Sequence, residues 1–124
     1  MPSFDSVLTE EKGIPERARL FLRETRSMIA VHILYPKTDD STFDMEYYVG
    51  SHMPMLADAL GDACTGWGAS GASGNWAAIG WAMVASQDAF DAAMAEHGGK
   101  IISDLANYTN VQPELVIGEV AHTS

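Results

Sequence analysis

The alternation of apolar and polar positions predicts a sheet interleaved with helices. Met28–Tyr35 is β-branched and almost wholly apolar, which predicts a first strand covered on both faces. Along Trp76–Val84, bulky side chains alternate with Ala and Gly, which predicts a strand with one bulky and one small face. Cys64–Ala69 and Glu114–Val120 are predicted as two further strands. The glycine-rich run 66–74 is expected to form a long, mobile hairpin loop.

A helix is predicted between the first two strands, from Asp44 to Leu60. Asp44 is a suitable N-cap, and Phe43 can pack on Tyr48 as a hydrophobic staple. Pro54 has no N–H to donate, so we expect the helix to kink or restart there.

The second predicted helix follows the third strand. Ser86 is its expected N-cap, and Phe90, Ala93, Met94 and His97 share one face. The pair Gly98-Gly99 is expected to interrupt this helix, with one or two further turns over Lys100–Leu105.

The resulting order, β-α-β-β-α-β, predicts an α+β ferredoxin-like sandwich over residues 28–121. Both helices would cover one face of a four-stranded sheet and leave its apolar second face bare. Two copies are therefore expected to close their sheets over each other as a homodimer. Residues 1–27 differ in composition and are predicted to form an added arm with a short helix from Pro15 to about Thr25.

Composition narrows the classes of partner. The chain has 124 residues, 7 basic and 17 acidic side chains, and a formal net charge of −10. This balance argues against a nucleic-acid partner and against anionic membranes, because no basic cluster exists. No apolar stretch is long enough to span a bilayer, and the single cysteine, Cys64, allows no internal disulfide. These features predict a cytoplasmic protein.

His52 is the first candidate for chemistry, because it lies on a helical face with Tyr48, Met55 and Leu56. One interpretation is structural, with the imidazole bonded to a carbonyl freed near Pro54. The other is functional, with the ring acting as general base or acid on a phenol or enol. No carboxylate is expected on the same face, so burial favours a neutral imidazole at pH 7.

Other residues could assist His52 or line a cavity. Tyr48 could orient the imidazole or a substrate oxygen, whereas Tyr47 is expected to face elsewhere. Asn110 is either an assisting catalytic residue or a turn residue bonded to its own backbone. His32 either lines the barrel interior or is satisfied by a neighbour.

Large side chains supply candidates for ligand binding. The tryptophans are typical of a core or an interface, but any that faces a cavity would form an aromatic wall for a planar ligand. The expected ligand-binding residues are His32, Trp67, Trp81, Met83 and Tyr108. No metal site is predicted, because the four histidines and one cysteine show none of the usual ligand spacings.

Two stretches resemble the EthD family, which is named after ethyl tert-butyl ether degradation. They are Phe43-Asp44-x-x-Tyr47-Tyr48-x-x-x-His52-Met53-Pro54 and Asn107-Tyr108-Thr109-Asn110-Val111-Gln112-Pro113, and the likeness spans roughly residues 28–121. The resemblance implies a dimeric α+β barrel in which each subunit binds a small organic molecule. No cofactor is expected, but haem held by a single histidine stays open as an alternative, because the resemblance extends to a wider barrel superfamily in which relatives bind haem.

Two functions follow from the residues and the resemblance together. The first is cofactor-free acid–base or oxygenative chemistry on an aromatic or polyketide-like substrate, with His52 central and Tyr48 and Asn110 assisting. The alternative is an accessory protein that supports a monooxygenase degradation system and binds the same ligand without turnover.

Overall fold

The computed structural model describes residues 28–123, so the predicted arm 1–27 lies outside the described residues. Its elements run in the order β1 (Ile29–Pro36), α3 (Met45–Tyr47), η1 (Tyr48–His52), α4 (Met53–Leu60), η2 (Gly61–Ala63), β2 (Cys64–Gly71), β3 (Trp76–Val84), α5 (Gln87–Ser103), η3 (Asp104–Asn107) and β4 (Glu114–Glu119). The three ranges β1, β3 and β4 agree with the predicted strands within one residue at each end.

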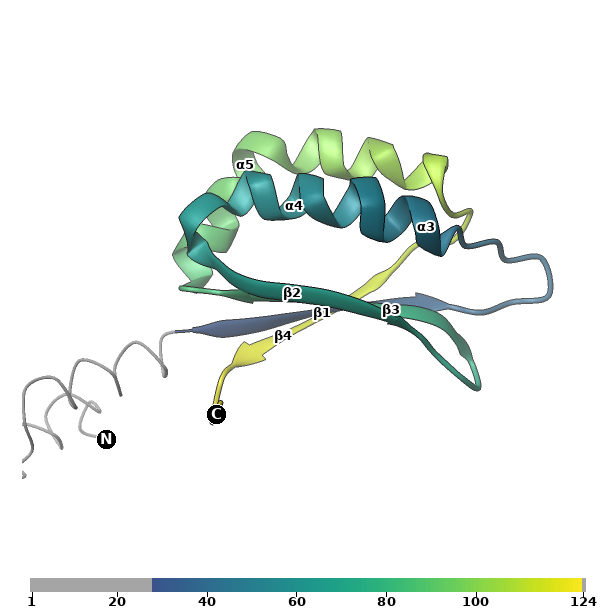
Figure 1. Cartoon of the computed structure of the whole chain (residues 1–124), viewed down its shortest axis with the longest axis horizontal. Helices are drawn as coiled ribbons and strands as arrows, with labels where there is room; N and C mark the ends of the chain where they lie inside the picture. Colours follow the sequence, from purple (N-terminus) through teal and green to yellow (C-terminus); the bar gives the residue numbers. More distant parts are fainter. Residues whose placement is uncertain (1–27, 124) are drawn as a thin grey trace, which may run out of the picture.

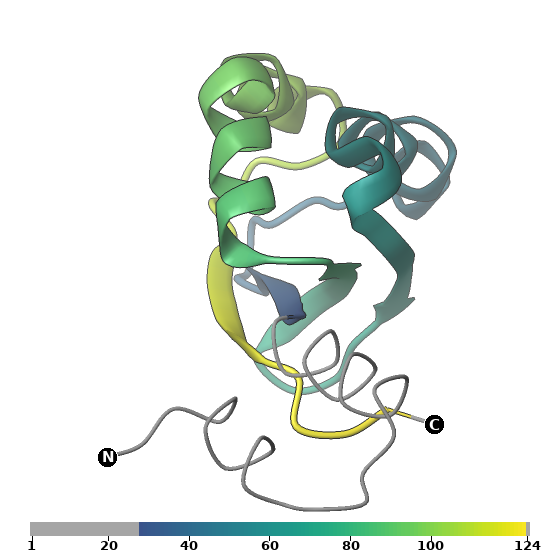
Figure 2. The ribbon, with the colours of Figure 1, turned by 90° about the vertical axis from the view of Figure 1, so that its left-hand side faces the viewer.

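One antiparallel sheet with the order β2-β3-β1-β4 carries the helices on a single face (Figure 1). Seen along the sheet, α4 and α5 lie side by side over it, and no described element covers the other face (Figure 2). The predicted α+β ferredoxin-like fold is therefore confirmed. Among the described residues, no helix is long and apolar enough to cross a membrane.

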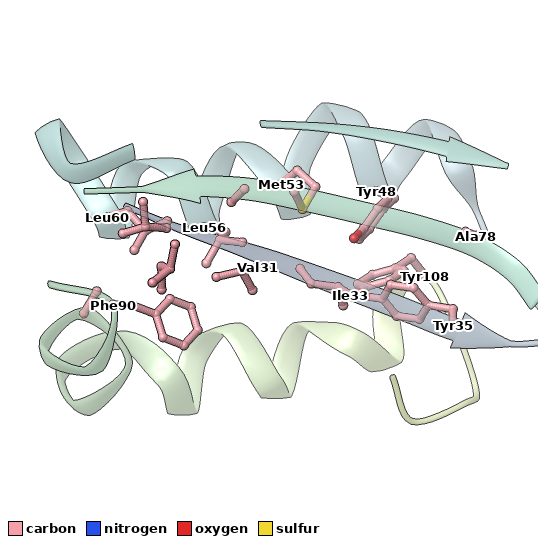
Figure 3. Packing of buried hydrophobic residues seen from close by; sticks show 14 residues of the cluster. Val31, Ile33, Tyr35, Tyr48, Met53, Leu56, Leu60, Ala78, Phe90 and Tyr108 are labelled. Carbon is pink, nitrogen blue, oxygen red and sulfur yellow. The ribbon is translucent and has the colours of Figure 1, made fainter. Parts of the chain in front are cut away.

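The core fills the layer between the helices and the sheet (Figure 3). Alternate residues of β1 are buried there, from Ile29 through Val31 and Ile33 to Tyr35. On β3 the face of small residues turns toward the helices, and this allows a close approach. A side chain at Gly80 would collide with the Tyr48 hydroxyl, so only glycine fits beneath this tyrosine.

The predicted loop over 66–74 is wrong for most of its length. Strand β2 continues to Gly71 and pairs with β3 from Gly66 to Gly71, so the connection is confined to residues 72–75. Gly68 pairs with Trp81, whose indole lies over the bare glycine backbone. Pairing with a neighbouring strand has overridden the weak strand propensity of glycine.

The first helical run begins as predicted. The Asp44 carboxylate accepts from the Tyr47 N–H at 3.1 Å, and the Phe43 and Tyr48 rings meet edge to face with centroids 5.0 Å apart. The backbone stays helical at Pro54. The hydrogen-bond pattern changes just before it, in the π-helical η1, where the Met53 N–H donates to the Tyr48 carbonyl five residues earlier. Pro54 then falls in the first turn of α4, directly after the π segment, where a residue without an N–H is best tolerated.

This re-registration changes which residues face the core. Met53, five residues after Tyr48, is fully buried, whereas Met55 is only half-buried. The predicted stripe through Met55 was drawn for a regular helix of 3.6 residues per turn, and the π segment shifts that phase.

The second helix is confirmed at its start and longer than predicted. The Ser86 hydroxyl accepts from the Ala89 N–H at 3.1 Å, as an N-cap should. The expected interruption at Gly98-Gly99 is wrong, because α5 runs unbroken from Gln87 to Ser103. Two glycines weaken a helix by about 1 kcal/mol each relative to alanine, which packing on the sheet outweighs.

Candidate functional site

A cavity of about 470 Å³ lies between the helices and the sheet. Its walls are mostly apolar and come from β1, α4, α5 and β4. Ile102 of α5 and Leu115 of β4 both line it while 65% and 56% exposed, so they flank its mouth. Three polar residues, Tyr35, His52 and Gln112, also line the cavity. A largely apolar space with a few polar groups is typical of small-molecule sites.

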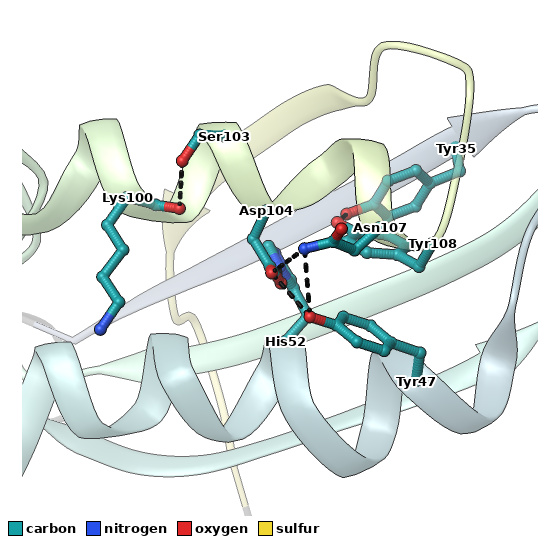
Figure 4. Close-up of polar contacts among 8 residues, drawn as sticks. All are labelled: Tyr35, Tyr47, His52, Lys100, Ser103, Asp104, Asn107 and Tyr108. Atoms are coloured by element: carbon teal, nitrogen blue, oxygen red, sulfur yellow. Dashed lines mark hydrogen bonds and ion pairs between the residues drawn. The ribbon is translucent and has the colours of Figure 1, made fainter.

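His52 enters the cavity wall from the π segment with one ring nitrogen already bonded. The side chain is 3% exposed, and its Nδ1 lies 2.9 Å from Oδ2 of Asp104 (Figure 4). The expectation that no carboxylate would approach this imidazole is therefore wrong. Asp104 begins η3, which packs against the π segment although the two residues are 52 positions apart.

The Asp104 carboxylate receives two further hydrogen bonds, both at Oδ1. The Tyr47 hydroxyl donates at 2.7 Å and the Asn107 amide donates at 2.9 Å. Burial alone would raise the pKa of Asp104, but the hydrogen bonds from Asn107, His52 and Tyr47 together hold it below the usual 3.8. Asp104 is therefore a carboxylate at neutral pH.

An ionised Asp104 determines which nitrogen of a neutral His52 carries the proton. A carboxylate has no proton to donate, so Nδ1 must be the N–H that donates to it. The Nε2 atom then holds a lone pair, and it has no hydrogen-bond partner among the residues that the structure describes. The site thus presents a hydrogen-bond acceptor to the cavity.

Tyrosines form the layer behind His52. Tyr48 is fully buried and stacks on the imidazole with centroids 5.7 Å apart, but its hydroxyl has no hydrogen-bond partner within residues 28–123. Asp104, not Tyr48, is thus the residue whose hydrogen bond orients the ring. The hydroxyls of Tyr35 and Tyr108 are 2.7 Å apart. Burial raises the pKa of all three tyrosines, so they are neutral phenols at physiological pH.

Comparison with known structures places the chain in a family. An EthD-like protein from Ralstonia eutropha is 37% identical, with 80% of this chain and 96% of that one covered and a TM-score of 0.72. The chain belongs to the EthD-like family. The chain is also similar to an ethyl tert-butyl ether degradation (EthD) family protein from Bacillus halodurans, with 16% identity and a TM-score of 0.56. The match covers 74% of this chain and 97% of that one. A third similar structure is HapK from Hahella chejuensis, with 16% identity and a TM-score of 0.55. The match covers 78% of this chain and 95% of that one.

These two more distant structures show the same fold, and the resemblance to the EthD family inferred from the sequence is confirmed. No family model matches the chain, and no curated protein matches it either.

The two EthD-like motifs meet in the structure. Phe43 pairs with Thr109 in an isolated β-bridge, and the Asp44 N–H donates to the Tyr108 carbonyl at 2.8 Å. Asn110 accepts from the N–H of residue 42 at 2.9 Å and donates to the carbonyl of residue 40 at 2.8 Å. The Asn110 side chain therefore holds the backbone of the loop before α3, and it does not line the cavity.

The residues predicted to bind a ligand do not gather in one place. His32, Trp81 and Met83 lie on the open face of the sheet, opposite the helices. Trp67 pairs with Ala82 and lies on the helix side of the edge strand β2. Tyr108 packs against His52 with ring centroids 4.6 Å apart. Of all eight predicted site residues, His52 alone lines the cavity between the helices and the sheet.

Three residues of this arrangement, Asp104, Tyr47 and Asn107, were not predicted as site residues from the sequence. Asp104 lies three positions before Asn107, the first residue of the second EthD-like motif, and this helical spacing places the two on one face. That spacing was a usable signal, but nothing local links it to His52. Tyr47 was expected to face elsewhere, and the structure directs its hydroxyl to Asp104 instead. No group of three potential metal ligands occurs among residues 28–123.

Proposed function

We propose that this EthD-like protein binds a small, mostly apolar molecule that carries a hydroxyl group, with that hydroxyl directed at His52. The observation that carries the proposal is the buried His52–Asp104 pair in the wall of an apolar cavity. Because the Nδ1 proton is held by the carboxylate, Nε2 is suited to accept a hydrogen bond or a proton. A phenol or an enol meets that requirement, and a simple ketone does not.

The same geometry supports general-base chemistry. Transfer of the hydroxyl proton of a phenol or enol to Nε2 leaves a phenolate or enolate and an imidazolium. The neighbouring Asp104 carboxylate, 2.9 Å from Nδ1, stabilises the imidazolium. An enolate or phenolate is also the electron-rich form that reacts with dioxygen, so acid–base and cofactor-free oxygenative chemistry share this first step. The absence of a cofactor stays a prediction.

The glycine pair in α5 supports a functional cavity. Gly98 and Gly99 both line the cavity, and each weakens the helix by about 1 kcal/mol relative to alanine. A Cβ at Gly98 would meet only the Met94 Cβ at 3.8 Å, and one at Gly99 would meet nothing within 4 Å. Packing therefore does not require glycine at either position, and the space that the pair leaves open serves the cavity.

Calorimetric titration with two matched probes tests the proposal. We expect 1-naphthol to bind more tightly than 1-methoxynaphthalene by about tenfold, because only the former donates a hydrogen bond to Nε2. His52→Phe keeps an aromatic ring but removes the acceptor, so the preference should disappear. Equal affinities in the unmodified protein would refute the acceptor role, and no binding of either probe would argue against an aromatic ligand.

The accessory-protein alternative uses the same cavity and differs in turnover. A native mass spectrum of the protein as purified would identify the chemical class of a retained molecule. Incubating that molecule with the unmodified protein and with His52→Gln then separates the two functions. Conversion that falls about 10²–10⁴-fold in the variant indicates general acid–base catalysis. Binding without conversion in both indicates the accessory role.

We also propose that two copies pair through the open face of the sheet. Ala30, Leu34, Ile79, Trp81 and Met83 form a mostly apolar surface around His32 there, and no described element covers it. A surface of this kind is typical of an interface between subunits.

A further inference from the structure

We infer that Tyr47 and Asn107 are positioning residues that hold the Asp104 carboxylate and thereby keep the imidazole proton of His52 on Nδ1, so that Nε2 presents a lone pair to the cavity. The catalytic consequence rests on the proposed function, whereas the positioning itself can be measured on the protein without any ligand.

The two oxygens of Asp104 have separate tasks. Oδ2 faces His52 Nδ1 at 2.9 Å, while Oδ1 accepts from the Tyr47 hydroxyl at 2.7 Å and the Asn107 amide at 2.9 Å. The Asn107 amide also lies 3.3 Å from the Tyr47 hydroxyl as a donor, which closes a triangle around Oδ1. With both oxygens engaged, the carboxylate cannot rotate without breaking a hydrogen bond.

The two donors come from different elements, so the triangle also joins those elements. Tyr47 ends α3 immediately before the π segment that carries His52, and Asn107 ends η3, which Asp104 begins. The Tyr47 ring is itself held, because it stacks on Tyr108 with an interplanar angle of 17°. Tyr108 in turn lies against His52, so the donor and the imidazole share one packed neighbour.

Removing either donor would weaken the hold on the proton at Nδ1. The titratable groups that face Asp104 are His52, Tyr47 and Tyr108. The hydrogen bonds from Asn107 and Tyr47 both lower the pKa of Asp104, so losing one favours its protonated form. When the carboxylate is held less tightly, its hydrogen bond with Nδ1 favours the Nδ1–H tautomer less strongly. The tautomer with the proton on Nε2 then becomes more populated. That tautomer presents a donor to the cavity instead of an acceptor.

Nuclear magnetic resonance on the full-length protein tests this inference directly. Tyr47→Phe and Asn107→Ala should each raise the midpoint of the Asp104 carboxyl ¹³C titration, corresponding to an increase in proton affinity of up to about tenfold. The ¹⁵N shifts of the His52 imidazole should move from the Nδ1–H pattern toward a mixture of tautomers. Tyr48→Phe is the matched control, because it removes the adjacent hydroxyl, which has no hydrogen-bond partner. It should leave both signals unchanged.

The two variants lose different side chains, so a folding defect in one leaves the other as the test, and a dispersed amide spectrum verifies folding. If both folded variants keep the Asp104 midpoint and the His52 ¹⁵N shifts of the unmodified protein, Tyr47 and Asn107 do not position the pair and the inference is wrong. If the shifts move as expected but the naphthol preference is absent, the positioning stands and the proposed function fails.

Discussion

At the scale of single residues, the two nitrogens of His52 face different surroundings. Nδ1 faces a carboxylate that is held by two further donors, and Nε2 is left to a mostly apolar cavity. Burying Asp104 is costly unless its charge is compensated, and the three hydrogen bonds supply that compensation. The His52–Asp104 pair therefore stabilises the fold through Nδ1, while Nε2 takes no part in the hydrogen bonds of the described residues.

The Asp104 carboxylate should make stability depend on pH in one direction. Its pKa in the folded protein lies below 3.8, so ionisation favours folding. This contribution is complete above about pH 4 and is lost as the pH falls through the folded pKa. Asp104→Asn should accordingly lower the free energy of unfolding at pH 7, with the difference shrinking near pH 3.

Urea denaturation at the two pH values measures this difference. Asp58→Asn, at an exposed position of α4, controls for removing one negative charge. A stability deficit of Asp104→Asn that stayed constant down to pH 3 would contradict the ionised hydrogen-bonded carboxylate.

Tyr48 and Gly80 should be coupled in stability. Gly80→Ala places a methyl group against the Tyr48 hydroxyl and should cost about 1–3 kcal/mol by overpacking. Tyr48→Phe should not destabilise the protein, because the hydroxyl it removes is buried without a partner. The double variant should recover much of the loss in chemical denaturation. Strictly additive effects would show that the two residues do not interact.

At the scale of elements, the π segment and α5 form opposite walls of the cavity. The π segment brings both Tyr48 and His52 into the core, which a regular helix would not do together with Met53. On the other side, α5 exposes bare backbone at Gly98 and Gly99. The π segment thus contributes His52 to the cavity wall, and α5 leaves space in the cavity at its two glycines.

Gly98→Ala should raise stability while weakening binding. Alanine favours the helix by about 1 kcal/mol, and its methyl group fits at 3.8 Å from the Met94 Cβ. The same methyl projects into the cavity lining, so the affinity for 1-naphthol should fall several-fold. Denaturation and calorimetry measure the two effects. Ala95→Gly, at an exposed position of the same helix, should lower stability and leave the affinity unchanged. Unchanged affinity in Gly98→Ala would remove Gly98 from the binding site.

At the scale of the whole molecule, the two faces of the sheet have different surroundings in the described residues. The helices cover one face and enclose the cavity. The other face carries Trp81, 37% exposed, with its indole over Gly68 of the neighbouring strand. An uncovered, mostly apolar face on a four-stranded sheet suits association with a second copy.

Trp81→Arg should therefore dissociate the proposed dimer. Analytical ultracentrifugation at micromolar concentration should give about twice 13.4 kDa for the unmodified protein and about 13.4 kDa for the variant. Trp67→Arg is a matched control, because Trp67 is 39% exposed but lies on the helix side of β2. A monomeric unmodified protein, or equal dissociation by both variants, would exclude pairing through this face.

The sequence by itself determined the fold class and most element boundaries. The strand Trp76–Val84, the caps at Asp44 and Ser86 and the staple between Phe43 and Tyr48 were all predictable. Each depends on residues near one another in the chain, where spacing fixes geometry. Burial of His52 was predictable for the same reason, because its apolar neighbours recur at helical intervals.

Only the tertiary structure determined the hydrogen-bond partner of His52 and the cavity that its side chain lines. Its partner Asp104 is 52 positions away, and Tyr47, Asn107 and the cavity walls converge only when η3 packs on the π segment. The length of β2 was likewise decided by pairing with β3 across a glycine-rich stretch of weak propensity. Local pattern carries no information about contacts of this kind, because their geometry is set by how distant elements pack.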